Sequence, residues 1–330
     1  MRRIIKQLVN KLMPNALWKW GLFKMLKADY LLLQRMSRPF ESSEDHALAK
    51  LTFNYHRIEK GLTMPDFRPG FGAGLVKEMM ADLIAYETAG YSKTCTTYRH
   101  AVGVLYEYVQ THRECSFDLG EIGELLNEFF KTHSAAATKQ LSYTSETFFA
   151  HSHEDFAAFA ASRHTVRHYA GRVPERDIIE AVELASLAPQ ACNRRFTRVH
   201  LYQGEKVQQL LAMQNGNRGF GHLCEQLLVL TADTDAALFG NEWHDLQTNV
   251  GIFAMNLSYA LHYKHVAHCL LNLWRSPGTD SQFRRIAEIL PNEVPVLCIS
   301  CGQAPTHFKV AGSPKPDIEE LLTVHAEQNA

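Results

Sequence analysis

The sequence lacks three features that would place it in a special structural class. No stretch approaches the roughly 20 consecutive apolar residues that a helix needs to span a bilayer. With 19 glycines and 12 prolines in 330 residues, the composition excludes collagen-like and low-complexity chains. A chain of this length and ordinary composition is expected to fold into one or two globular domains, each with its own core.

Cysteine is also too sparse and too scattered for a disulfide framework. There are seven cysteines, an odd number without regular spacing, which excludes a secreted disulfide-rich scaffold and fits reduced thiols in a cytoplasm. Cys298 and Cys301 form a CxxC pair, but they lie within the apolar run 296–301. That run predicts a buried strand with core thiols, whereas a redox or metal pair is the alternative.

The net charge of -1 conceals a strongly basic N-terminus. Residues 1–40 carry nine Lys and Arg against Asp29 alone, so this segment has a charge of +8 and the rest of the chain has -9. Such a segment predicts a local contact with an anionic surface rather than with nucleic acid. Within this segment, apolar residues recur at helical spacing and Trp residues stand beside Lys residues. This pattern favours either a helix in the membrane interface or a helix packed on the rest of the protein.

No secretory signal is expected, because lysines interrupt the first apolar residues and no small-residue cleavage site follows. We therefore expect a cytoplasmic protein, free or peripheral to the inner face of the membrane.

The pattern of apolar residues divides the chain near residue 150. The first part, 1–150, is helical in pattern, and its polar run 131–147 predicts a linker. Its expected helices after the basic segment cover 46–56, 75–88, 93–113 and 119–133. The second part, 151–330, mixes helical and strand patterns. Its expected helices cover 154–161, 174–187, 205–213, 243–263 and 279–290, and its expected strands cover 198–202, 227–231 and 295–301.

Three polar clusters in the second part could carry chemistry. The first, Arg163, His164, Thr165 and Arg167, directly follows an expected helix. Guanidinium groups offer forked donors that suit phosphate oxygens, and the hydroxyl adds another donor. A solvated turn is the alternative interpretation of this cluster.

The second and third clusters are loops. The second, Pro189, Gln190, Ala191, Cys192 and Asn193, can present backbone donors and an amide to a planar heterocycle, although it also fits an ordinary helix-to-strand turn. The third places Lys309, Ser313 and Lys315 after the last expected strand, where they supply cations and a hydroxyl. Taken alone, that composition is common on protein surfaces.

The order and spacing of these clusters together resemble the nitroreductase family. The segment 163–167 resembles the Arg-Arg/His-Ser-x-Arg/Lys signature that holds the FMN phosphate and ribityl chain in that family. The segment 189–193 resembles its Pro-Ser-x-x-Asn loop, which reaches the flavin ring of the partner subunit. The stretch 249–257 resembles the central dimer helix, and 313–316 resembles the terminal phosphate contact.

This resemblance implies an α+β domain with a mainly antiparallel sheet flanked by helices, preceded by an all-α N-terminal region. It implies a homodimer that binds FMN and passes hydride from NADH or NADPH through flavin N5 to a small-molecule acceptor. No side chain is nominated as a catalytic acid or base. The cofactor-binding residues implied are Arg163, His164, Thr165, Arg167, Pro189, Gln190, Ala191, Asn193, Lys309 and Lys315.

Two departures from the family pattern concern the acceptor. Arg194 and Arg195 stand where many members have Ser-Gln, and residues 265–268 lack the glycines found after the long helix. The two arginines favour an anionic acceptor over an ordinary nitroaromatic one. The alternative function is a flavin-binding or non-enzymatic partner of a membrane-associated complex, of the kind that builds surface polysaccharides.

Three further features have a structural and a functional interpretation. His262, His265 and His268 could bind a metal, but no ligand set is complete and we expect none. The loop 215–221 is glycine-rich, and a plain loop is favoured over a phosphate contact. The segment 55–62 predicts a helix end with i,i+3 charge pairs, and a role on the substrate side is the alternative.

Overall fold

The computed structural model describes residues 16–36, 43–134, 138, 140–273 and 277–325. The N-terminal half is helical, as expected, with α2 (Ala16–Met36), α3 (Glu44–Leu62), α4 (Ala73–Thr88), α5 (Thr96–Glu114) and α6 (Glu121–Phe129). Helix α3 begins where the side chain of Ser43 accepts a hydrogen bond from the backbone N–H of His46. It runs to Leu62, six residues beyond the end predicted from the sequence.

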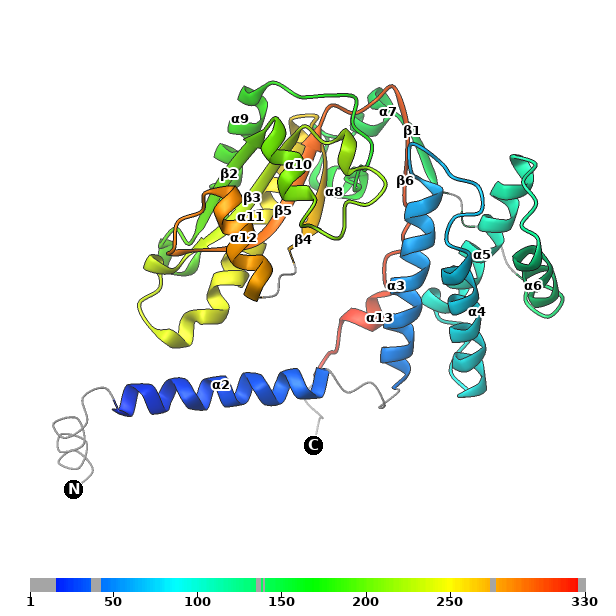
Figure 1. The fold of residues 1–330 in the computed structure, drawn as a ribbon, viewed down its shortest axis with the longest axis horizontal. Helices are drawn as coiled ribbons and strands as arrows, with labels where there is room; N and C mark the ends of the chain where they lie inside the picture. Colours follow the sequence, from blue (N-terminus) through cyan, green and yellow to red (C-terminus); the bar gives the residue numbers. More distant parts are fainter. Residues whose placement is uncertain (1–15, 37–42, 135–137, 139, 274–276, 326–330) are drawn as a thin grey trace.

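Helices α3 to α6 form one bundle with its own core, whereas α2 extends away from it (Figure 1). Leu51 and Ile58 of α3, Leu83 of α4 and Leu105 of α5 are fully buried in that core. Helix α2 instead contacts the 3₁₀ turn η4 (Gly240–Glu242) of the second half. Among the described residues, no helix combines the length and apolar character needed to cross a bilayer.

The second half is built on a four-stranded sheet with the order β2-β3-β5-β4. Its strands are β2 (Thr197–Gln203), β3 (Gln226–Asp233), β4 (Ala267–Asn272) and β5 (Glu293–Gly302), and all neighbours pair antiparallel. Every residue of β3 is buried, which explains its nearly continuous apolar sequence. The expected α+β class with a mainly antiparallel sheet is confirmed.

Helices cover both faces of this sheet, so its core has two layers. Helices α9 (Glu175–Ala185) and α11 (Trp243–Tyr263) pack on one face. Helices α10 (Glu205–Leu211) and α12 (Pro277–Ala287) pack on the other. Further 3₁₀ turns are η1 (Ala191–Asn193), η2 (Gly221–Leu223) and η3 (Thr234–Ala236).

A second, two-stranded sheet lies where the two halves meet (Figure 1). Strand β1 (Leu141–Thr144) pairs antiparallel with β6 (His307–Val310), and α7 (Ser145–Phe149) follows β1 directly. Phe148 and Phe149 of α7 are buried in the core of the sheet domain. The other short helices are α8 (Phe156–Ser162) and α13 (Ile318–Leu321).

Three strands differ from the sequence-based prediction. The run 131–147, interpreted as a linker, contains β1, and this strand lies within the region predicted to be all helical. Strand β6 follows the strand predicted to be last, so Lys309 lies in a strand rather than a loop. Strand β4 was not predicted, because its histidine and cysteine continue the helical spacing of α11. All three strands acquire their structure through pairing with distant partners.

Candidate functional site

The first polar cluster follows α8 and runs beside the edge strand β4. The side chain of Asp155 caps α8 by accepting hydrogen bonds from the backbone N–H groups of Ala157 and Ala158. After the helix, the backbone N–H of Val166 donates to the carbonyl oxygen of His268 at 3.0 Å. Val166 is fully buried, so this segment is fixed against β4 and its arginines are held partly inside the protein.

Arg163 and Arg167 both carry a buried Nε–H group that has no hydrogen-bond partner among the described residues. Burial lowers the pKa of the Arg163 guanidinium. A buried donor without an acceptor is costly, and a buried charge without a counter-charge is costlier still. Both costs would be relieved by an anion with several oxygen atoms, such as a phosphate group.

The charge of Lys315, in the C-terminal loop, also acts on this cluster. Burial lowers the pKa of His164, and the charges of Lys315 and Arg163 lower it further, although a hydrogen bond to the Ser162 carbonyl raises it. Arg163 and Lys315, which lie in distant segments of the sequence, therefore both act electrostatically on the His164 ring.

A cavity of about 680 Å³ lies between α3 and the sheet domain, beside Arg167. Its walls come from α3, from the loop 214–219 and from β4. No carboxylate lies among the described residues that line it, whereas five cations do: Arg57, Lys60, Arg68, Arg167 and Arg218. Lys60 donates to the carbonyl oxygen of Gly216 at 3.2 Å, and burial and then the charge of Arg167 lower its pKa.

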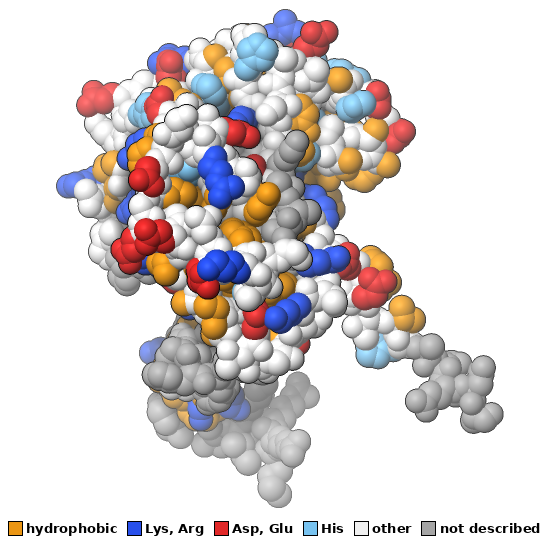
Figure 2. Space-filling view, turned by 90° about the vertical axis from the view of Figure 1, so that its right-hand side faces the viewer, with side chains coloured by type: hydrophobic (Ala, Val, Ile, Leu, Met, Phe, Trp, Pro, Cys, Tyr) orange, Lys and Arg blue, Asp and Glu red, His pale blue; other side chains and the backbone are white. Residues whose placement is uncertain are grey.

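This concentration of positive charge is a property of the cavity and not of the whole surface. Figure 2 shows acidic and basic side chains interspersed over the face of the molecule that includes the helical bundle. Low-dielectric walls lined by one sign of charge focus the electrostatic potential, so the cavity is suited to an anionic ligand.

The second cluster, residues 189–193, lies apart from that cavity. Pro189 lines an apolar groove of about 760 Å³ between α9 and α11, together with Tyr259. The backbone N–H of Ala191 donates to the side chain of Asn249 at 2.8 Å, and Gln190 accepts weakly from the Thr197 N–H. Asn193 has a left-handed φ of 54°. In the described part of the chain, the hydrogen bonds of these residues go to Asn249 and Thr197 and not to the cluster of Arg163.

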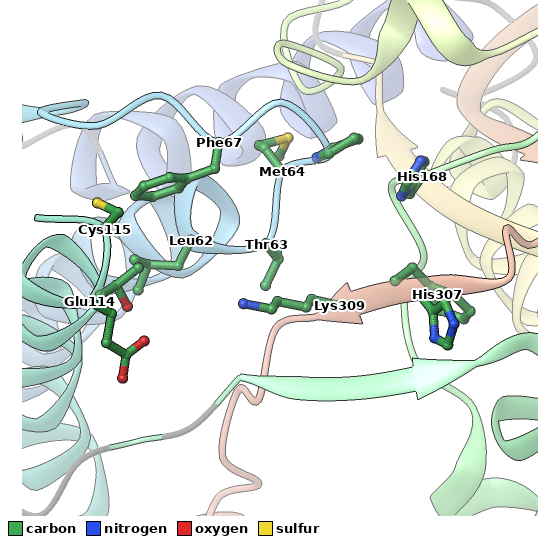
Figure 3. Close-up of a pocket in the computed structure, with 12 residues that line it drawn as sticks. Leu62, Thr63, Met64, Phe67, Glu114, Cys115, His168, His307 and Lys309 are labelled. Atoms are coloured by element: carbon green, nitrogen blue, oxygen red, sulfur yellow. The ribbon is translucent and has the colours of Figure 1, made fainter.

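Lys309 lines a third cavity, of about 440 Å³, at the end of α3. Figure 3 shows its side chain extending from β6 toward Thr63 and Glu114, on the side away from His168. Thr165, a member of the first cluster, is half-buried. Lys315 is not among the residues that line this cavity, although the sequence places it in one short segment with Lys309.

The three histidines near the end of α11 do not share one helical face. His262 lies in α11, His265 in the following turn with φ of 56°, and His268 in β4. Each contacts a different serine through Nε2, at 2.7 to 2.8 Å: Ser162, Ser152 and Ser258, respectively. Burial lowers the pKa of His262 to about 3 and that of His268 to about 4. No group of residues in the described part of the chain has the composition of a metal site.

Sequence reasoning favoured a structural role for the end of α3 and left a role on the substrate side as the alternative. The segment 55–62 was noted for its charges, and the predicted i,i+3 pairing is present between His56 and Glu59. What the pattern did not reveal is that Glu59 also contacts Ser313, which lies 254 positions later in the chain. The sequence feature that could have pointed to this role is the unusual density of charged residues on one turn of the helix.

No family model matches the chain, and no curated protein resembles it in sequence. Solved structures that resemble it include a nitroreductase family protein from Streptococcus pneumoniae, with 21% identity and a TM-score of 0.46, covering 52% of this chain and 100% of that one. An NAD(P)H:FMN oxidoreductase from Staphylococcus epidermidis has 14% identity and a TM-score of 0.45, covering 52% and 96%. A nitroreductase in complex with FMN from Desulfovibrio desulfuricans has 14% identity and a TM-score of 0.45, covering 52% and 97%.

Proposed function

We propose that this protein is an FMN-dependent oxidoreductase that passes hydride from NADH or NADPH to a small anionic acceptor. The observation that carries the proposal is the pair of buried, unpartnered Nε–H groups on Arg163 and Arg167. They occupy the positions at which the sequence resembles a flavin phosphate signature, and the charge of Lys315 acts on His164 of the same segment. Cationic groups with free donors fit a phosphate monoester.

In this proposal, Arg163, Arg167 and Lys315 hold the cofactor phosphate, and Thr165 adds a hydroxyl donor. Bound FMN would supply the hydride chemistry, which no amino-acid side chain provides. The chain itself would bind and orient the reactants. Arg57, Lys60 and Arg218, which line the cavity beside Arg167, would attract an acceptor that carries negative charge.

A homodimer is part of the same proposal. The groove between α9 and α11 is lined by apolar side chains, among which Leu187, Ile252 and Tyr263 are 79%, 42% and 43% exposed. Apolar surface of this kind is typical of a protein interface. A second copy of the chain packed there would bring the loop 189–193 toward the cofactor of its partner, as the family resemblance implies.

The decisive experiment is an absorption spectrum of the freshly purified protein, followed by extraction and identification of the cofactor. We expect a yellow protein that releases FMN and is bleached by NADH or NADPH. With 4-nitrophenyl phosphate and 4-nitroanisole as matched acceptors, the anionic compound should have the lower KM. Protein that is colourless and takes up no added FMN would refute the proposal.

One observation supports the alternative function as a partner at a membrane. Helix α2 exposes Trp20, Phe23 and Leu26 to more than half of their full extent, and the exposed Lys24 lies over the Trp20 ring. Aromatic and aliphatic side chains beside lysines are suited to the interface of an anionic bilayer.

This alternative predicts co-sedimentation with vesicles that contain phosphatidylglycerol, but not with phosphatidylcholine alone. Replacing Lys24 and Lys27 by Glu should weaken binding at least about tenfold, since each cation near an anionic surface contributes about 1 kcal/mol. The matched control is Lys131→Glu, an exposed charge on the helical bundle. Equal binding to both vesicles would exclude an electrostatic membrane contact.

A further inference from the structure

Glu59 of α3 is a fully buried carboxylate at the junction of the two halves. It lies 2.8 Å from Nε2 of His100 on α5, and it accepts from the backbone N–H and hydroxyl of Ser313 at 3.2 and 3.0 Å. Burial raises its pKa, but the hydrogen bonds from His100, His56 and Ser313 outweigh that effect and hold the pKa at about 2. Glu59 is therefore an ionised group in a fixed position.

The imidazole of His56 lies between Glu59 and the cationic cavity. Its Nδ1 is 3.5 Å from a carboxylate oxygen of Glu59, and its Nε2 accepts from Nη2 of Arg167 at 3.4 Å. A carboxylate only accepts hydrogen bonds and a guanidinium only donates them. Both contacts, although long, therefore place the proton of the neutral ring on Nδ1 and the lone pair on Nε2.

His56 also has access to both ligand and solvent. It lines the cavity beside Arg57, Lys60 and Arg167, and 39% of its side chain is exposed. The charged groups around this ring are those three cations, Arg218 among the other residues that line the cavity, and the carboxylate of Glu59. Cys269 of β4, a thiol whose pKa is raised by burial, adds no charge.

We propose that His56 is the proton donor for the acceptor that binds in this cavity, and that Glu59 is its positioning residue. This inference rests on the proposed function, in which a hydride reduces the acceptor. Hydride transfer adds two electrons and one hydrogen nucleus, leaving a negative charge on an acceptor oxygen. The Nε2–H bond of protonated His56 then breaks and an O–H bond forms. The ring returns to its neutral state with Nδ1–H toward Glu59, and solvent restores the proton on Nε2.

The test compares two anionic acceptors that differ in their need for a proton. Reduction of 1,2-naphthoquinone-4-sulfonate requires hydride and a proton, whereas ferricyanide takes single electrons and no proton. In stopped-flow measurements on the FMN-loaded protein, His56→Gln should slow reoxidation of the reduced flavin by the quinone about 100-fold. The rates of flavin reduction by NADH or NADPH and of flavin reoxidation by ferricyanide should stay within about twofold of those of the unmodified protein.

Either of two results would overturn the proposal: an unchanged rate with the quinone, or an equal loss with both acceptors, which would indicate a role in binding or folding. Glu59→Gln should reproduce the selective loss, and Glu59→Asp, which keeps the carboxylate, should restore most of the rate. The matched control is His133→Gln, which removes a histidine paired with Glu87 at 2.8 Å outside this cavity. It should change neither rate.

A second readout needs no flavin. Nitrogen NMR of the full chain labelled at histidine, with His56 assigned by comparison with His56→Gln, should show the neutral ring protonated at Nδ1. A ring protonated at Nε2 would contradict the proposed geometry even if the protein reduces acceptors. Conversely, a protein that binds no FMN refutes the proposed function, while the NMR result still decides the pairing of His56 with Glu59.

Discussion

Arg163 is the residue on which the proposed cofactor site depends most. Its guanidinium is partly buried, and its Nε–H has no acceptor among the described residues. A charge-assisted hydrogen bond contributes about 1.5–3 kcal/mol when its partner is present.

We therefore expect Arg163→Gln to weaken FMN binding about 10- to 100-fold, measured by quenching of flavin fluorescence. The control is Arg172→Gln, because Arg172 is paired with Glu225 on the surface. Equal affinities of Arg163→Gln and the unmodified protein would place the phosphate elsewhere.

Glu59 should make the stability of the protein dependent on pH in the acid range. Its pKa is about 2 in the folded protein, against an ordinary value of 4.5. A depressed carboxylate pKa adds stability that is fully present above pH 4.5 and is lost as the pH falls toward 2. At about 1.4 kcal/mol for each pKa unit, this contribution is roughly 3 kcal/mol at pH 7.

Urea unfolding should therefore show that Glu59→Gln lowers the free energy of unfolding by that amount at pH 7 and by a smaller amount near pH 3. Glu128→Gln removes an exposed carboxylate paired with Lys131, and should cost less than about 1 kcal/mol at either pH. A loss for Glu59→Gln that did not vary with pH would show that its charge is not responsible.

At the scale of single elements, the last turn of α3 depends on a glycine that packs against a loop. A Cβ placed on Gly61 would lie 1.9 Å from the ring of Phe71, so only glycine allows this close approach. Gly61→Ala should therefore lower the free energy of unfolding by about 1–3 kcal/mol.

The matched control is Gly74→Ala in α4, where a Cβ would meet nothing within 4 Å. That change should be neutral or stabilise the protein by up to about 1 kcal/mol, because alanine favours the helix. Thermal unfolding of the two variants distinguishes them, and equal effects would contradict the tight contact at Gly61.

How well an element could be predicted depended on where its stabilising contacts come from. Helix α11 was predicted over its full length, because its apolar spacing over 21 residues is a local signal. Strand β3 was recognised from its apolar run. Strands β1 and β6 have four residues each and exist through pairing with one another across more than 160 positions. No local pattern predicts such a pair.

At the scale of the whole molecule, the exposed apolar groove along α11 predicts self-association. Met255, which lines this groove, is 38% exposed, and Met255→Glu would place a charge in the proposed interface. We expect this change to convert a dimer into a monomer in sedimentation velocity, with loss of FMN affinity if the loop 189–193 reaches the partner's cofactor.

The control is Ile84→Glu, which introduces the same charge at a 52% exposed position on α4. It should leave the sedimentation coefficient unchanged. A protein that is monomeric before any substitution would contradict the proposed dimer directly.

The sequence by itself determined the helical first half, the α+β second half and the three polar clusters, because apolar periodicity and side-chain chemistry are local properties. Only the tertiary structure decided which clusters meet. It placed Lys309 beside a cavity whose lining includes neither Arg163 nor Lys315. It also buried Glu59 of α3 against Ser313 and placed His56 beside Arg167. These contacts join segments more than 100 residues apart, and the packing of the bundle against the sheet domain sets them.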